Sequence, residues 1–436
     1  MNLLVIDPAA CALDLCLRSQ RGGHQVRWHR LPHDKGDPMK HGEGLVEIVQ
    51  DWERSMSWAD LVIVADNLKY LRILDGYRKR GFPVLGPSYA GAELELDREK
   101  GQDFLAECGV ETIPFEVFTD YDKAEAHVRK TMKRYVSKPS GEADKALSYV
   151  SKSPADMVYM LRRWKENKKL KAAPFVLQEF VPGIELAVGG WLGKGGFSKY
   201  WCENFEHKKL MNDDLGPNTG EMGTVLAYTT ESKLAEQVLK PCEQRLVDLG
   251  ITGYVDVAVI VDENGQALPL EFTVRPGWPT MNIQHWLHQG DELDWMTGLV
   301  DGDDRVDVSD QIAIGVVLAI PDFPYSQLTG KELEGYPIYG YDEVEKINFC
   351  EVMRGKAPVE RDGELVDQSM LVTSGDYVLV CCGVGDTVTD ARREAYNGLK
   401  KIQMPNSAFY RTDIGKRVVK DFEELQGHGF CTSWRI

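Results

Sequence analysis

Residues 251–280 read ITGYVDVAVIVDENGQALPLEFTVRPGWPT, and this stretch decides the fold. The run from Val255 to Val261 is rich in β-branched residues, which favour β-strands. Asn264-Gly265, a few residues later, is the strongest short signal for a β-hairpin. The sequence therefore predicts two antiparallel strands joined by a two-residue turn, and such a turn fixes which residues face one another.

The predicted register places Asp256 opposite Thr273 and Ala258 opposite Glu271. Side chains alternate between the two faces of a strand, so one face is polar and the other forms core. The core face carries Val255, Val257, Val259, Leu270, Phe272 and Val274, and the polar face carries Asp256, Glu271, Thr273 and Arg275. Cross-strand neighbours lie roughly 5 to 8 Å apart. Two carboxylates at that separation can hold a hard cation, and the simpler alternative is a solvated face with an ion pair.

Two motifs resemble a known family. Residues 270–277, LEFTVRPG, look like the metal-binding strand of ATP-grasp ligases. Residues 215–223, LGPNTGEMG, are similar to the GPNTGGMG loop of one family among them, phosphoribosylamine–glycine ligase, the second enzyme of purine synthesis. The likeness runs from Gly86-Pro87 to residues 411–417, RTDIGKR, which is about three quarters of the chain. The nine-residue loop is the more specific of the two motifs.

The resemblance implies a multi-domain α/β and α+β protein. Strands that alternate with helices predict an N-terminal parallel α/β substrate domain over residues 1–98, with a first helix that starts at Asp7-Pro8. An ATP-grasp domain is predicted over residues 99–308, with a lid subdomain over about residues 112–182 and one long helix from Ser232 to Leu249. Short strands and a helix then predict a C-terminal α+β domain over residues 309–436.

Composition limits the compartment and the partners. The net charge of −17 opposes a general nucleic-acid or anionic-membrane surface, because phosphate repels such a field. Nine cysteines without a regular spacing indicate reduced thiols. The N-terminus lacks the cationic start of a signal peptide, and the longest apolar run, Ile312 to Ile320, is too short to span a bilayer. These features predict a cytoplasmic protein, a monomer or small homo-oligomer that binds small molecules.

The resemblance also implies an ATP site. Its predicted residues are Lys138, Lys145, Gln178, Glu179, Val181, Glu185 and Lys208. Lys138 ends a strand where the family places a lysine on the α- and β-phosphates, and Lys145 lies in the loop that follows. Backbone groups near Glu179 and Val181 would bind the adenine edge, and Glu185 would accept hydrogen bonds from the ribose hydroxyls. For Lys138 and Glu185 the alternative is an ordinary exposed strand residue.

The metal and substrate residues follow from the same likeness. Magnesium, or manganese in its place, would bind to Glu271, Asp256 and Thr273, although the family has Asn rather than Thr at position 273. Arg275 would hold the acyl oxygens and, with Lys138, act in catalysis. Asn218, Thr219, Gly220, Arg275 and Trp278 are the predicted substrate-binding residues.

The chain departs from the family at the acceptor loops. Residues 7–14, DPAACALD, stand in place of the Gly-rich GxGGREH loop that holds the phosphate of phosphoribosylamine, and residues 65–69, ADNLK, replace the GPEAPL loop. Asp7 and Asp66 would repel a phosphate. Trp278 and Thr280 replace the acidic residues of the family's RFGDPE segment.

Three hypotheses follow for function. The first is an ADP-forming carboxylate–amine ligase that acts through an acyl phosphate and has an altered acceptor or acid pocket. The second is a true phosphoribosylamine–glycine ligase. The third is a non-catalytic nucleotide-binding protein with an ATP-grasp fold. The substituted acceptor loops favour the first hypothesis. The retained Lys138, Glu185, Glu271 and Arg275 oppose the third.

Overall fold

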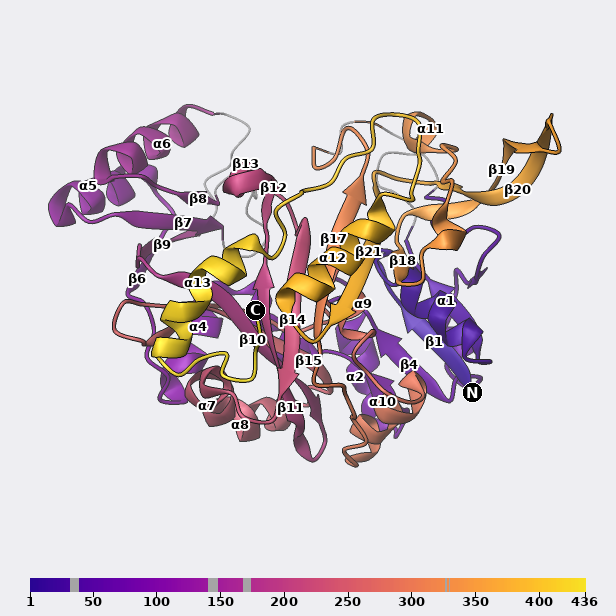
Figure 1. Cartoon of the computed structure of the whole chain (residues 1–436). Coiled ribbons are helices and arrows are strands. Elements are labelled where there is room, and N and C mark those ends of the chain that lie inside the picture. Colours follow the sequence, from indigo (N-terminus) through magenta and orange to yellow (C-terminus); the bar gives the residue numbers. More distant parts are fainter. Residues whose placement is uncertain (32–38, 140–147, 168–173, 326–327, 329) are drawn as a thin grey trace.

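The computed structural model describes residues 1–31, 39–139, 148–167, 174–325, 328 and 330–436. Three larger sheets organise these residues: a parallel sheet near the N-terminus, a small sheet at the upper left of the molecule, and a long central sheet (Figure 1). In the described part of the chain, no helix is long and apolar enough to cross a membrane. The predicted fold class, with an N-terminal α/β domain, an ATP-grasp centre and a C-terminal part, is confirmed.

The N-terminal sheet has five parallel strands in the order β3-β2-β1-β4-β5. They are β1 (Asn2–Ile6), β2 (Gln25–His29), β3 (Glu47–Ile48), β4 (Leu61–Val64) and β5 (Val84–Leu85), joined by α1 (Leu13–Arg21), η1 (Trp52–Ser55) and α2 (Leu71–Lys79). Parallel strands are buried on both faces, which explains their unbroken apolar sequences. The first helix begins at Leu13 and not at Asp7, so that prediction was wrong. The Asp7 carboxylate accepts the N–H of Ala12 at 2.7 Å and thereby holds residues 7–12 as a loop.

The small sheet forms the core of the predicted lid. Its antiparallel strands lie in the order β6-β9-β7-β8 and pack against two helices. The elements are β6 (Phe115–Phe118), α5 (Tyr121–Thr131), β7 (Tyr135–Pro139), β8 (Tyr149–Val150), α6 (Pro154–Glu166) and β9 (Phe175–Glu179). Ser153 caps α6, because its hydroxyl accepts the N–H of Asp156. The predicted loop at residues 140–145 lies outside the described residues.

The central sheet joins the ATP-grasp and C-terminal parts. Its eight antiparallel strands lie in the order β16-β15-β10-β11-β14-β17-β21-β18. They are β10 (Ile184–Gly193), β11 (Gly196–Glu206), β14 (Gly223–Thr229), β15 (Gly253–Val261), β16 (Ala267–Thr273), β17 (Ile312–Ala319), β18 (Ile347–Phe349) and β21 (Tyr377–Gly385). Strand β17 pairs directly with β14, so the strands that follow residue 308 extend the ATP-grasp sheet. Helix α12 (Val388–Leu399) covers β17 and β21 (Figure 1).

The other elements connect or flank these sheets. They are α3 (Tyr89–Leu96), α4 (Arg98–Glu107), β12 (Lys209–Met211), η3 (Asn212–Asp214), β13 (Leu215–Asn218), α9 (Thr280–Gln284), α10 (Glu292–Asp301), α11 (Gly330–Leu333), η5 (Tyr341–Glu343), β19 (Val352–Arg361), β20 (Glu364–Thr373) and α13 (Lys416–Gly427). The helix predicted from Ser232 to Leu249 is broken into α7 (Lys233–Val238), η4 (Lys240–Cys242) and α8 (Glu243–Asp248). Pro241 explains the break, because it has no N–H to continue the helical ladder.

The central hairpin keeps the predicted register by a different route. Asp256 pairs with Thr273 and Ala258 with Glu271, as predicted. The loop, however, has three residues and not two, because the N–H of Asp262 bonds the carbonyl of Gln266. The register shifts between Ala258 and Val259, which pairs with Pro269, so Leu270 is the extra residue of a β-bulge. The longer loop and the bulge compensate each other.

Gly265 closes this loop in the left-handed region, with φ at 74°, and a Cβ there would lie 2.5 Å from the His428 ring. We expect Gly265→Ala to lower the free energy of unfolding by both the backbone cost, roughly 1–2 kcal/mol, and a steric cost. Gly290→Ala is the control, because Gly290 has φ at 77° and open space around its Cβ position. Urea denaturation should rank Gly265→Ala as the less stable variant, and equal loss in the two would exclude the clash with His428.

Candidate functional site

Glu271 lies at the centre of a cluster of charges. Its carboxylate forms an ion pair with Arg98, and its Oε1 lies 3.9 Å from Lys208 Nζ. Burial alone would raise the pKa of Glu271, but Arg98, Lys138 and Lys208 together lower it well below its usual range. Glu271 is therefore ionised at any physiological pH and attracts cations.

Lys208 joins the carboxylates of three strands. Its Nζ lies 3.0 Å from Glu206 Oε2 and 3.1 Å from Glu185 Oε1, in addition to its contact with Glu271. Burial opposes the charged form, yet the three carboxylates raise the pKa of Lys208 well above its usual value. A half-buried lysine that neutralises three acidic groups is a fixed positive charge in the site.

Lys138 approaches the same cluster from the lid strand β7. Its Nζ donates to the carbonyl oxygen of Leu270 at 3.4 Å, and Gln102 Nε2 donates to the same oxygen at 3.1 Å. Leu270 is the bulged residue, so the bulge turns a carbonyl toward the lysine. Burial lowers the pKa of Lys138 to about 8, and Glu271 opposes that shift. Lys138 is thus held beside Glu271 in a mostly protonated form at neutral pH.

Asp256 is buried on the neighbouring strand. Its Oδ2 accepts hydrogen bonds from Asn204 Nδ2 at 2.9 Å and from Tyr254 Oη at 3.2 Å. Gly189 makes room for it, because a Cβ there would lie 2.8 Å from Asp256 Oδ2. Burial and the nearby Glu206 raise the pKa of Asp256 to about 7. Thr273 is half-buried in the paired position opposite Asp256.

The predicted adenine hinge follows β9. Gln178 is buried in that strand, and the Glu179 carboxylate pairs with Lys133 Nζ at 2.5 Å. The N–H of Glu179 bonds the carbonyl of Pro114 at 2.9 Å, so this donor is already used. The N–H of Val181 makes no hydrogen bond with any described residue, which leaves it available for a ligand. Lys145 lies outside the described residues.

The loop over residues 215–223 supports Lys208. The N–H and the hydroxyl of Thr219 both donate to the carbonyl of Lys208, at 2.7 and 2.9 Å. Both Thr219 donors therefore position Lys208 in this arrangement, and substrate binding by Thr219 stays a prediction. Asn218 and Gly220 are exposed on either side of Thr219.

Arg275 lies between the central hairpin and the N-terminal domain. Its guanidinium pairs with Glu95 at 3.3 Å, and Glu95 also accepts the N–H of Val274 at 2.8 Å. Trp278 donates its indole N–H to the carbonyl of Ala65 at 3.3 Å. These contacts bring the Arg275 segment against the loop that carries Asp66.

The two N-terminal loops use their own backbone donors. Asp66 accepts the N–H of Ala9 at 2.8 Å and that of Leu68 at 2.9 Å. Asp7 accepts the N–H of Ala12 and the indole N–H of Trp28, the latter at 3.0 Å. Burial raises the pKa of both carboxyls, that of Asp7 to about 7 with a contribution from Asp66. Backbone N–H groups that could hold a phosphate are thus occupied by carboxylates.

Three acidic or basic groups of the cluster were missed in the sequence. They are Arg98, Glu206 and Glu221. Arg98 had a signal, since Asp97-Arg98 stands where the family has Ser-Lys. Glu221 had one too, because it interrupts the family's GPNTGGMG loop. Glu206 offered no motif, and only the end of β11 brings it within reach of Lys208.

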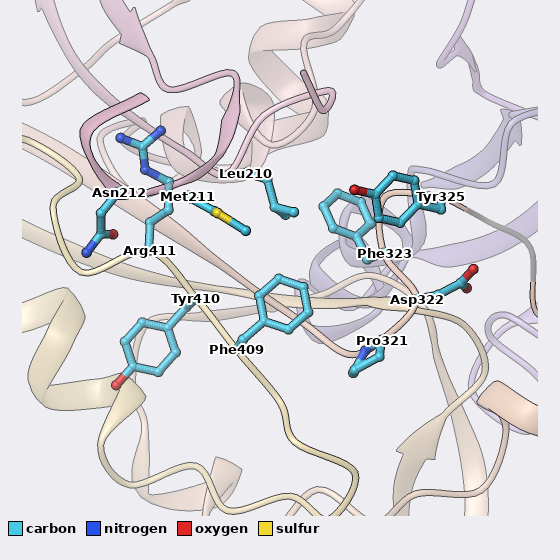
Figure 2. A pocket seen from close by; sticks show the side chains of 10 residues that line it. All are labelled: Leu210, Met211, Asn212, Pro321, Asp322, Phe323, Tyr325, Phe409, Tyr410 and Arg411. Atoms are coloured by element: carbon cyan, nitrogen blue, oxygen red, sulfur yellow. The ribbon is translucent and has the colours of Figure 1, made fainter. Parts of the chain in front are cut away.

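A separate apolar pocket of about 700 Å³ lies beside the β12–β13 hairpin (Figure 2). It is lined by Leu210, Met211, Asn212, Pro321, Asp322, Phe323, Tyr325, Phe409, Tyr410 and Arg411. Leu210, Phe323 and Phe409 face the same space in this view. The Arg411 guanidinium bonds Asp413 and Asp214 and so offers no free charge to the pocket.

Comparisons with known proteins agree with this arrangement. The model of the phosphoribosylglycinamide synthetase ATP-grasp (A) domain matches residues 97–281, and that of its C domain matches residues 313–417. This chain belongs to the phosphoribosylglycinamide synthetase family of ATP-grasp proteins. The family forms carbon–nitrogen bonds with release of ADP, so the chain is an ATP-grasp ligase.

Relatives and solved structures extend the comparison. The phosphoribosylamine–glycine ligase of Xanthomonas axonopodis pv. citri is 29% identical over 371 residues, 82% of each chain. That of Salmonella typhimurium is 27% identical over 374 residues, 83% of this chain and 84% of its own. The structure of a phosphoribosylamine–glycine ligase from Thermotoga maritima superposes with a TM-score of 0.69 at 21% identity, covering 95% of this chain and 100% of that one. An L-amino acid ligase from Bacillus licheniformis gives 0.55 at 15% identity, covering 92% and 98%. These structures show the shared fold.

The raised pKa of Asp7 generates a prediction for stability. The folded state binds a proton at Asp7 up to about pH 7, whereas the unfolded chain releases it near pH 4, so stability is lost as the pH rises through this window. We expect Asp7→Asn to remove this loss, so its gain in unfolding free energy over the parent should be larger at pH 8 than at pH 5. The difference should be on the order of 1–3 kcal/mol. Asp103→Asn, at an exposed position, is the control, and an equal effect of Asp7→Asn at both pH values would contradict the prediction.

Proposed function

We propose that this ligase joins a small carboxylic acid to an amine other than phosphoribosylamine, through an acyl phosphate formed from ATP. The observation that carries the proposal is the pair Asp7 and Asp66. Their carboxylates accept the backbone N–H groups of the two loops at which the family would bind the acceptor's phosphate. The acceptor amine is therefore neutral or cationic near these residues.

The electrostatic argument is simple. A phosphate site needs free N–H donors and a close backbone approach, which glycine allows. This chain has Pro8, which lacks an N–H, and the N–H groups of Ala9 and Ala12 already bond carboxylates. Each like charge near a phosphate would cost on the order of 1 kcal/mol at about 4 Å in water, and more in a closed site.

ATP would bind between the lid and the central sheet. Lys138 and Lys208 supply positive charge for its phosphates, and the unbonded N–H of Val181 faces the adenine edge, with Gln178 and Glu179 beside it. The Glu185 carboxylate would accept hydrogen bonds from the ribose hydroxyls of ATP. Those hydroxyls would compete for it with Lys208. Lys145 completes this set as a proposal from the sequence.

The described acidic residues fit a magnesium ion as oxygen donors. Glu271 is ionised, and Asp256 and Glu206 are close enough for Glu206 to raise the pKa of Asp256, a repulsion that a divalent cation would relieve. Among the described residues no three such side chains are already grouped as a metal site, so the phosphates would complete the ligand set. Glu271 and Asp256, with Thr273 nearby, would hold Mg²⁺ or Mn²⁺, which neutralises phosphate charge when bound.

The chain's own residues then align the reactants. The carboxylate of the acid attacks the γ-phosphorus, the bond from that phosphorus to the ADP oxygen breaks, and ADP leaves. The amine next attacks the acyl carbon, phosphate departs with the bonding electrons, and the amide nitrogen loses a proton. Arg275 would hold the acyl oxygens and Lys138 the phosphoryl oxygens, so both act by stabilising charge. Asn218, Gly220 and Trp278 would border the substrates.

A second candidate function is phosphoribosylamine–glycine ligase itself. Relatives of that name align over more than four fifths of this chain. Either function would place the protein in the cytoplasm with small-molecule partners. The two candidates differ only in the amine and acid they accept, and the Asp7 and Asp66 loops favour the first.

Glu271 should be required for metal-dependent turnover. Glu271→Gln keeps the shape but removes the charge, so we expect ADP formation with Mg²⁺ to fall by on the order of 100-fold or more while the melting temperature changes little. Glu263→Gln, at an exposed position in the same hairpin, should retain activity. Release of AMP and pyrophosphate by the parent would contradict the acyl-phosphate route.

The acceptor can be tested directly. The assay supplies glycine, ATP, Mg²⁺ and freshly prepared phosphoribosylamine and follows glycinamide ribonucleotide, with the Salmonella typhimurium relative as the positive control. We expect little or no product from this chain, because Asp7 and Asp66 repel the phosphate. Turnover in the ordinary enzyme range, about 1 to 1,000 per second, would instead establish the second candidate.

A further inference from the structure

Glu221 is a buried carboxyl group at the edge of the charged cluster. Glu221 is only 7% exposed, and its Oε2 accepts a hydrogen bond from the Thr224 hydroxyl. None of the ion pairs among the described residues includes Glu221. The Glu206 carboxyl shares a hydrogen bond with Glu221, and the nearby Lys208 only partly opposes the effect of burial. Burial of an acidic side chain that makes no direct ion pair is costly, so its presence needs an explanation.

The explanation starts from two substitutions in the family motifs. The family loop GPNTGGMG has glycine where this chain has Glu221, and the family segment RFGDPE has glutamate where this chain has Thr280. These positions are 59 residues apart in the sequence, yet Thr280 Oγ1 lies 3.5 Å from Glu221 Oε2. The two changes therefore transfer one carboxylate across a contact, from the start of α9 to the loop before β14.

The surroundings of Glu221 carry both signs of charge. Arg275 interacts electrostatically with Glu221 and Glu206. The Tyr377 hydroxyl lies within electrostatic range of Glu221 and is buried without a hydrogen-bond partner among the described residues. The guanidinium and the acidic group together suit a molecule that carries both a carboxylate and an ammonium group.

We propose that Glu221, with the hydroxyls of Thr280 and Tyr377, is the subsite for the ammonium group of an amino-acid substrate whose carboxylate lies at Arg275. The inference rests on the proposed ligase function and names its acid as an amino acid. Burial and Glu206 raise the pKa of Glu221 well above its usual range, and a bound ammonium would supply a direct counter-charge.

Binding measurements test the subsite apart from turnover. Calorimetry would follow a non-hydrolysable ATP analogue with Mg²⁺, and then glycine, L-alanine and the other common amino acids, with acetate as the carboxylate that lacks an ammonium. We expect the parent protein to bind at least one amino acid and to bind acetate far more weakly. Glu221→Gln should weaken amino-acid binding about 10- to 100-fold without changing binding of the analogue. Glu231→Gln, at an exposed position after β14, is the matched control and should change neither.

The exchange itself provides a second variant. Glu221→Gly combined with Thr280→Glu restores the family arrangement and should recover amino-acid binding to within about 10-fold of the parent. Unchanged amino-acid binding in Glu221→Gln, or acetate binding as tight as that of any amino acid, would overturn the subsite. Failure of the parent to bind the ATP analogue would instead overturn the ligase function on which the subsite rests.

Discussion

The site depends on one half-buried positive charge. Lys208 lies within 4 Å of Glu185, Glu206 and Glu271, three acidic residues from three different strands. Without it, these carboxylates would repel one another and would have to bind protons, since like charges in a partly buried site cannot all remain ionised. Thr219 fixes the backbone of Lys208, which explains why a loop with a specific sequence lies beside a strand end. A bound nucleotide would add its negative charge to a cluster in which Lys208 already neutralises the acidic side chains.

The central hairpin shows both the power and the limit of sequence reasoning. Alternation and a turn signal predicted that Asp256 faces Thr273, and this pairing is present. The predicted loop length was wrong by one residue, and the bulge at Leu270 restored the pairing. Periodicity cannot reveal a bulge, because the extra residue is visible only against its partner strand. The bulge nevertheless matters for the site, since its carbonyl receives Lys138.

Contacts between distant segments set the remaining limit. Arg98 reaches Glu271 across 173 residues, and no local pattern in either segment predicts this ion pair. Motif comparison identified the family over about three quarters of the chain, and it singled out Lys138, Lys208 and Glu271, which the structure brings into one cluster. It could not show that Thr219 supports Lys208, or that the acidic residues of the first domain bond its own loops. Those facts depend on which donors remain free after folding, and only the three-dimensional arrangement determines that.

The same constraint links the two departures from the family. Asp7 and Asp66 accept the backbone N–H groups of their own loops, whereas Glu221 is a buried acid that makes no direct ion pair among the described residues. In the first case the protein satisfies its acidic groups internally, and under the proposed function this closes a phosphate site. In the second case it leaves a buried acid in need of a positive partner. The two proposed substrates meet these two conditions separately: an acceptor amine without a phosphate suits the loops of Asp7 and Asp66, and an amino acid brings an ammonium group to Glu221.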